Sequence, residues 1–195
     1  CRTSSEDYRP PRRVDWIVTE FFGASAVDLL LTGTMGDATR RFLKPGGRVI
    51  PSTVRLFVAP FECGSLYRRE LGRPNPKLYG LDFSVTTRMI ANTVMHRNLQ
   101  KGRRLAKPGL LGQMRLPGDL PRELRSRMVF NCETQGMLHA FALWFDADLA
   151  EGVRLSTDPT SPPIAWQQLF LPLERPIPVA PGHRATRGRC ARRSS

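Results

Sequence analysis

The chain has 195 residues, of which 41% are hydrophobic, and 30 Lys and Arg against 17 Asp and Glu give it a net charge of +13. This mixture is typical of a globular protein and excludes a fully disordered chain. No apolar run approaches the roughly 18 residues that cross a bilayer, so we expect no membrane partner. The positive charge favours acidic partners, with weak binding of nucleic acid as one alternative.

The cysteines and histidines are too scattered to predict a metal site. No two of the four cysteines form a CxxC pair, and the three histidines lie far apart in the sequence. Such sparse cysteine use fits a reducing compartment. We therefore expect no metal and a cytoplasmic location, with the nucleus as an alternative.

The first third of the chain has the pattern of an α/β sheet. Residues 1–13 are polar and are expected to be disordered, and the start at Cys1 rather than Met favours a fragment or a processed chain. Strand, loop and helix, turn, and strand are then predicted in that order. These predictions cover residues 14–19, 21–42, 44–47 and 48–60.

The rest of the chain is predicted to be mostly β. A helix is expected over residues 85–97, and short strands at close spacing suit a sandwich or barrel. The strand candidates are residues 110–114, 127–130, 136–146 and 166–173. Residues 183–195 are rich in Arg, Gly and Ser and are expected to form a disordered basic tail.

Five segments, in the correct order, resemble those of protein arginine methyltransferases. The first is similar to the segment that opens the family's substrate loop, and the last resembles the loop that closes over the substrate. They are Val14–Gly23, Phe42–Pro51, Leu78–Ser84, Ala140–Asp146, and Leu155–Thr157 together with Pro162, Trp166, Gln167 and Gln168.

The resemblance implies the fold and its domains. The C-terminal end of a Rossmann-like methyltransferase domain would occupy residues 14–61. A helical dimerisation arm would follow over residues 62–98, and a partial β-barrel over residues 99–182. The family's barrel continues with further strands, so a truncated gene product is one reading of this chain.

The resemblance also implies the site. A cationic, planar guanidinium is held by paired, charge-assisted hydrogen bonds to two carboxylates, which in the family are glutamates about nine residues apart. Glu20 matches the first and is expected to bind substrate and act in catalysis, whereas the second position is Leu29, with Asp28 beside it as a candidate. The family's Thr-His-Trp element aligns with Ile164-Ala165-Trp166, which keeps only the Trp as a substrate-binding candidate.

The cofactor implied by the resemblance is S-adenosylmethionine. Its Gly-rich binding loop would precede Cys1, and Gly46-Gly47 is predicted to be only a turn, so the cofactor motif is absent from this chain.

Altered catalytic elements beside a retained arm and barrel favour a non-catalytic, prozyme-type subunit that supports an active arginine methyltransferase. The partner would be that active subunit in a hetero-oligomer, or a second copy in a homodimer, and the substrates would be Arg-rich proteins. The alternatives are an active enzyme that uses Glu20 and Asp28, and a basic nucleic-acid-binding module.

Overall fold

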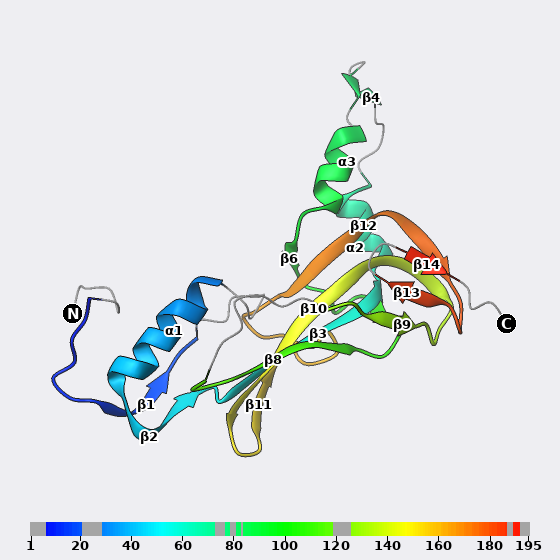
Figure 1. Ribbon diagram of the computed structural model, residues 1–195. Coiled ribbons are helices and arrows are strands. Elements are labelled where there is room, and N and C mark those ends of the chain that lie inside the picture. The colour runs from blue at the N-terminus through cyan, green and yellow to red at the C-terminus, as the bar shows by residue number, and fades with distance from the viewer. Residues whose placement is uncertain are drawn as a thin grey trace.

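The computed structural model describes residues 7–20, 29–72, 77–78, 81–82, 84–118, 126–186 and 189–191. Figure 1 shows a small α/β unit at one end of a curved sheet and a short helical projection that rises above this sheet. The helices are α1 (Leu29–Phe42), α2 (Gly64–Glu70) and α3 (Ser84–Ala91). The strands are β1 (Val14–Val18), β2 (Leu43–Ile50), β3 (Thr53–Glu62), β4 (Lys77–Leu78), β5 (Leu81–Asp82), β6 (Met95–Arg97), β7 (Arg103–Arg104), β8 (Gly109–Arg115), β9 (Val129–Asn131), β10 (Gly136–Ala150), β11 (Val153–Ser156), β12 (Gln168–Val179), β13 (Arg184–Thr186) and β14 (Arg189–Ala191).

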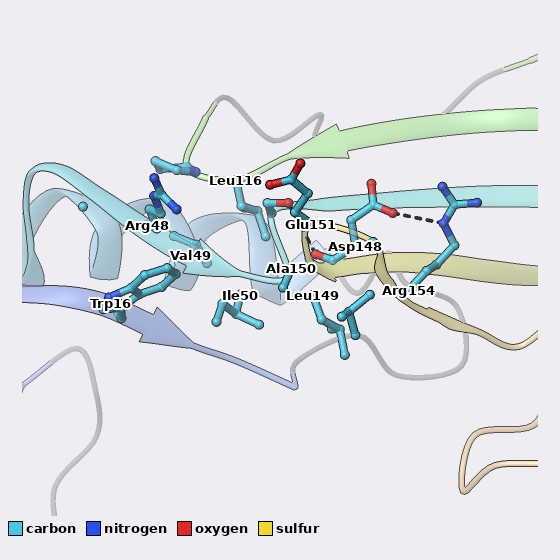
Figure 2. Close-up of a pocket in the computed structure, with 15 residues that line it drawn as sticks. Trp16, Arg48, Val49, Ile50, Leu116, Asp148, Leu149, Ala150, Glu151 and Arg154 are labelled. Carbon is cyan, nitrogen blue, oxygen red and sulfur yellow. Dashed lines mark hydrogen bonds and ion pairs between the residues drawn. The ribbon is translucent and has the colours of Figure 1, made fainter.

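The α/β unit consists of two parallel strands and the helix between them. β1 pairs with β2 in a register that sets Ile17 opposite Val49, and α1 contributes Met35 to the small core that these residues share with Leu43. The first strand and the helix predicted here are present. The single strand predicted over residues 48–60 is wrong, because the chain breaks at residues 51–52 into β2 and β3, which belong to different sheets. β1 and β2 lie beside the hairpin formed by β10 and β11 (Figure 2).

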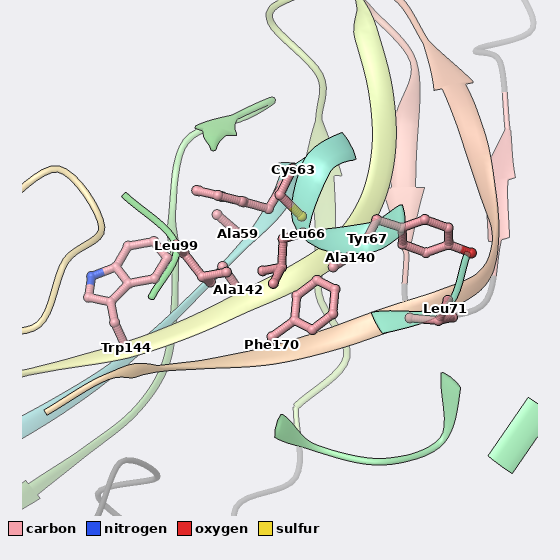
Figure 3. Close-up of a cluster of buried hydrophobic side chains, with 11 residues drawn as sticks. Ala59, Cys63, Leu66, Tyr67, Leu71, Leu99, Ala140, Ala142, Trp144 and Phe170 are labelled. Atoms are coloured by element: carbon pink, nitrogen blue, oxygen red, sulfur yellow. The ribbon is translucent and has the colours of Figure 1, made fainter. Parts of the chain in front are cut away.

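The main sheet is antiparallel and is built around β10. Its order is β6-β12-β10-β3-β7, with β11 also paired to β10 and β8 to β3. β10 is long and apolar because it is covered on both faces, which is the burial predicted for residues 138–145. On one face, α2 contributes Leu66 and Tyr67 to a buried cluster that also contains Phe170 and, at its other end, Trp144 (Figure 3).

The opposite face of the sheet carries a second core. Leu138 and Phe141 of β10 pack there with Phe130 of β9 and Ala185 of β13, and β9, β13 and β14 form a small sheet of their own. The prediction that the chain is disordered from residue 183 is therefore wrong for β13. Ala185 is fully buried opposite Phe130, so this strand closes the second core.

The N-terminal segment is also more ordered than predicted. Within residues 7–13, the Arg13 Nη1 group donates to the Leu43 carbonyl at 3.2 Å, and Arg41 Nη1 donates to the Tyr8 carbonyl at 2.7 Å. The Tyr8 ring meets the Phe42 ring edge-on at 5.9 Å. The predicted disorder is thus wrong for residues 7–13, while residues 1–6 lie outside the described part.

The helix predicted over residues 85–97 ends earlier than expected. The Asn92 side chain donates to the Arg88 carbonyl at 2.8 Å and the Thr93 hydroxyl donates to the Met89 carbonyl at 2.9 Å, which satisfies helix carbonyls at the end of α3. The chain then extends into β6, which pairs with β12. Of the described helices, none has the length and apolar character of a membrane span.

Candidate functional site

Glu20 lies just beyond the end of β1. The Thr19 N–H donates to the Ile50 carbonyl at 3.0 Å, which continues the parallel pairing for one residue past the strand. Glu20 follows and is exposed, and its carboxylate has no hydrogen-bond or ion-pair partner in the described part of the chain. The first expected clamp residue is therefore free to accept hydrogen bonds from a ligand.

The second expected clamp position coincides with the start of a helix. Leu29, nine residues after Glu20, is the first residue of α1. Asp28, the alternative candidate, lies outside the described residues. The second expected clamp position therefore carries an apolar residue in place of a glutamate.

Trp166 is half-buried and packs into the barrel side of the molecule. Its ring meets the Phe145 ring edge-on, with centroids 6.3 Å apart, in a cluster that includes Leu149 and Leu155. The neighbouring Ala165, at the position of the family's histidine, is exposed and ends in a methyl group that cannot form a hydrogen bond. Here Trp166 has a packing role, and no described contact joins it to Glu20.

A buried polar network fixes both ends of the loop that carries Trp166. The side-chain oxygen of Gln168 accepts from the Leu99 N–H at 2.9 Å, and its Nε2 donates to the Thr157 carbonyl at 2.9 Å. The Thr157 hydroxyl in turn accepts from the Phe145 N–H at 2.9 Å and donates to the Phe145 carbonyl at 3.1 Å. Because buried polar groups without partners are costly, this network holds residues 157 and 168 at fixed positions on the barrel.

Charged and polar contacts tie the same loop to residues 100–104. Arg104 Nη1 lies 2.8 Å from Asp158 Oδ2, and Gln100 Nε2 donates to the Ser161 carbonyl at 3.0 Å. Arg104 also lies over the Trp144 ring, 5.9 Å from its centroid. Sequence reasoning missed Gln168, Thr157, Asp158 and Arg104 as the loop's supports. The only signal was that Gln168 lies within the family-like loop segment.

A cavity of about 680 Å³ separates the β1–β2 pair from the β10–β11 hairpin (Figure 2). Arg48 lies over the Trp16 ring at 5.5 Å on one wall, and Arg154 Nε is 3.1 Å from Asp148 Oδ1 on the other. Asp148 also accepts from Arg55, and this hydrogen bond lowers the pKa of its carboxyl group. Asp148 is thus already neutralised by two guanidinium groups, and neither Glu20 nor Trp166 lines the cavity.

The glycines of the α/β unit do not form a nucleotide-binding loop. Gly46 has φ of +76°, and a Cβ on Gly47 would lie 2.7 Å from the Leu43 side chain, so both residues serve a tight turn. That turn follows α1 and is part of β2, whereas a dinucleotide loop leads from a strand into a helix N-terminus. Gly46 and Gly47 therefore do not form a loop that would hold S-adenosylmethionine. Among the described residues, no group of three or more His, Cys, Asp or Glu could hold a metal ion.

A mostly β barrel region with a short helical projection, preceded by a strand–helix–strand unit, defines the class of protein. Residues 52–190 match the family model described as the arginine methyltransferase oligomerization subdomain. The chain therefore belongs to the protein arginine methyltransferase family, and its C-terminal oligomerization and β-barrel subdomain makes up most of it.

Relatives of known name agree with this assignment. Protein arginine N-methyltransferase 6 of Xenopus laevis is 29% identical over 180 residues, covering 87% of this chain and 53% of the relative. Probable protein arginine N-methyltransferase 3 of Arabidopsis thaliana is 31% identical over 194 residues, covering 88% and 30%. The chain thus spans about half the length of the first of these relatives, and less of the second.

Two solved structures share the fold. A chain of the Trypanosoma brucei PRMT1 enzyme-prozyme heterotetrameric complex with AdoHcy matches with a TM-score of 0.79 at 21% identity, covering 93% of this chain and 59% of that one. Arabidopsis thaliana protein arginine methyltransferase 10 matches with a TM-score of 0.72 at 24% identity, covering 93% and 61%.

Proposed function

We propose that this chain is part of a prozyme-type subunit, which lacks independent catalysis and supports an active arginine methyltransferase. The observation that carries the proposal is the leucine at position 29, nine residues after Glu20 and the first residue of α1, together with the alanine at position 165. A guanidinium held by one carboxylate instead of two lacks a charge-assisted partner, and an alanine cannot orient an acidic group. Removing one hydrogen-bond donor from an oxyanion hole lowers the rate about 10²- to 10³-fold, and we expect the loss of one carboxylate here to have an effect of that order.

β3 pairs with β10 and β8 in the main sheet, so the α/β part ends before residue 53 rather than at the predicted residue 61. Within this part, one face of β1 is exposed. Val14, Trp16 and Val18 alternate along the strand and are 38%, 51% and 75% exposed. Parallel sheets are normally covered on both faces, so two parallel strands with an open apolar face are incomplete by themselves. Residues 14–50 accordingly belong to a larger methyltransferase α/β domain, and S-adenosylmethionine is bound by other parts of that domain or by the partner subunit.

The surface of α3 supports residues 62–98 as the dimerisation arm. Val85 and Met89 lie four residues apart, hence on one helix face, and are 59% and 66% exposed. On the other side, Ile90 and Ala91 pack against the core. An apolar helix face that the described chain leaves uncovered suits contact with a second subunit.

Polar contacts hold the base of this arm. Glu70 at the end of α2 accepts from Arg97 of β6 at 2.9 and 2.8 Å. The Tyr67 hydroxyl group lies 2.9 Å from the Leu173 carbonyl and 3.0 Å from that of Glu174. These contacts hold α2 and β6, the elements on either side of α3 in the chain, to the barrel.

Co-expression of the complete protein with the active arginine methyltransferases of its organism tests this proposal. We expect a stable heteromeric complex on gel filtration and a rise in the partner's activity. The Met89→Lys variant should weaken the complex, whereas Glu133→Gln, which changes an exposed carboxylate elsewhere, should not. Absence of any complex together with unchanged partner activity would overturn the proposal.

A further inference from the structure

A single histidine lies between the start of α2 and the long strand β10. The register of β10 against β12 shifts between Leu138 and Ala140, so His139 stands at an irregular point of the strand. Its ring meets the Tyr67 ring of α2, with centroids 5.3 Å apart and the ring planes inclined by 51°. The His139 side chain therefore joins the sheet to the first turn of α2.

The imidazole of His139 is the acceptor for a buried backbone group. The Cys63 N–H donates to His139 Nδ1 at 3.3 Å. Cys63 is a buried residue at the N-cap position of α2, and its side chain makes no capping hydrogen bond. Within the described part of the chain, this N–H makes no other hydrogen bond. Because a buried N–H without an acceptor is costly, the start of α2 depends on this contact.

A proton added to the ring removes this contact. A neutral imidazole has one nitrogen that accepts a hydrogen bond, whereas an imidazolium ion donates from both nitrogens. Since Nδ1 accepts, the neutral ring carries its proton on Nε2, and a second proton binds at Nδ1 itself. We propose that His139 is a pH-sensitive switch: the neutral ring holds the start of α2 on β10, and protonation releases the Cys63 N–H and loosens that end of the helix.

The surroundings of His139 favour the neutral ring. Burial is the largest influence and lowers the pKa of His139, while Glu62 and the Met137 backbone oppose it and Arg68 lowers the pKa further. The Glu62 carboxylate already accepts from the Met137 N–H at 2.7 Å. The exposed Arg68 lies on the first turns of α2, and its Nη1 and His139 Nε2 are 3.5 and 3.4 Å from the point where a Cβ on Gly64 would stand.

The other titratable groups around the ring keep their charge near neutral pH. Burial raises the pKa of the Cys63 thiol to about 12, and burial together with Glu174 of β12 raises the pKa of Tyr67. The pKa of His139 is lower in the folded chain than the value of about 6.5 for an unfolded histidine. The stability that the neutral ring provides is therefore complete above pH 6.5 and is lost as pH falls through the folded pKa.

NMR of the complete protein between pH 7.5 and 5.0 tests the proposal by following the His139 ring and the Cys63 amide together. We expect the protection of the Cys63 amide against hydrogen exchange, corrected for the intrinsic rate, to fall about tenfold, which corresponds to the loss of one ordinary hydrogen bond. The midpoint of this fall should coincide with the titration of the His139 ring.

Three variants separate the switch from a general effect of acid. His139→Asn places an amide group that does not titrate near the position of Nδ1, so Cys63 protection should no longer depend on pH. Arg68→Gln changes an exposed residue and removes the neighbouring cation, so the midpoint should move to higher pH. His96→Asn, at an exposed histidine of β6, is the matched control and should behave as the wild type does.

The proposal would be overturned by any of three results. These are Cys63 protection that stays constant while His139 titrates, a pH dependence that persists in His139→Asn, and a midpoint that does not move in Arg68→Gln. All three measurements are made without a partner subunit. The switch and the subunit role therefore fail or stand separately.

Discussion

Replacement of Gln168 by Met tests whether the buried amide holds the Trp166 loop. Gln168 is 7% exposed, and its two hydrogen bonds, both 2.9 Å, reach the Leu99 N–H and the Thr157 carbonyl. Met preserves the length and approximate volume of the side chain but can make neither hydrogen bond. The change leaves a buried donor and a buried acceptor without partners, each at a cost of about 1 to 3 kcal/mol.

We therefore expect the free energy of unfolding to fall by about 2 to 6 kcal/mol, measured by urea denaturation with an unchanged m-value. Hydrogen exchange should become faster at Leu99 and across residues 157–167. Gln167→Met is the matched control, because residue 167 is exposed, and should change stability by no more than about 0.5 kcal/mol. A loss at Gln168 no larger than that of the control would refute the assigned role of the network.

Three further changes probe the arm base, the cavity wall and the arm surface. The hydrogen bonds from Arg97 lower the pKa of Glu70 to about 2. The ionised Glu70 therefore contributes fully to the free energy of unfolding above the unfolded pKa of about 4.3, and this contribution is lost as pH falls toward 2. Glu70→Gln should cost about 2 to 3 kcal/mol at pH 7 and little at pH 2 in denaturation curves. The pKa of Asp148 is also lowered, so its ionised carboxylate likewise stabilises the fold at neutral pH and not in acid. Asp148→Asn should therefore lower Tm at pH 7 by a few degrees, and this difference should disappear in acid. Met89→Lys should leave monomer stability within about 0.5 kcal/mol but weaken subunit association at least tenfold in light-scattering measurements.

The sequence predicted the strongly patterned elements of the fold. The apolar run around Phe141 and Trp144 was recognised as a buried strand, and β10 extends it to Ala150. The end of α3 was missed because it depends on side-chain hydrogen bonds from Asn92 and Thr93, which compete with continued helix. β13 was missed because its one buried residue, Ala185, is surrounded in sequence by Arg, Gly and Thr, and because the strand depends on pairing with distant β9 as well as with β14.

Only those residues of the candidate site that lie in family motifs could be predicted from the sequence. Glu20 and Trp166 were selected by their positions in those motifs, and the structure places them in separate surroundings. The supports of the Trp166 loop were not predictable, because Gln168 and Leu99 are 69 residues apart and no local pattern links them. The same holds for Arg104 and Asp158, which are 54 residues apart.

Methyl transfer by the complete protein alone is the most direct test of a subunit that has lost its own catalysis. The assay measures radiolabelled methyl groups transferred from S-adenosylmethionine to an Arg/Gly-rich peptide, with and without an active arginine methyltransferase. We predict no transfer above background by the protein alone and a rise in the partner's rate when both are present. Transfer by the protein alone that disappears in Glu20→Gln but persists in Glu133→Gln would contradict the account.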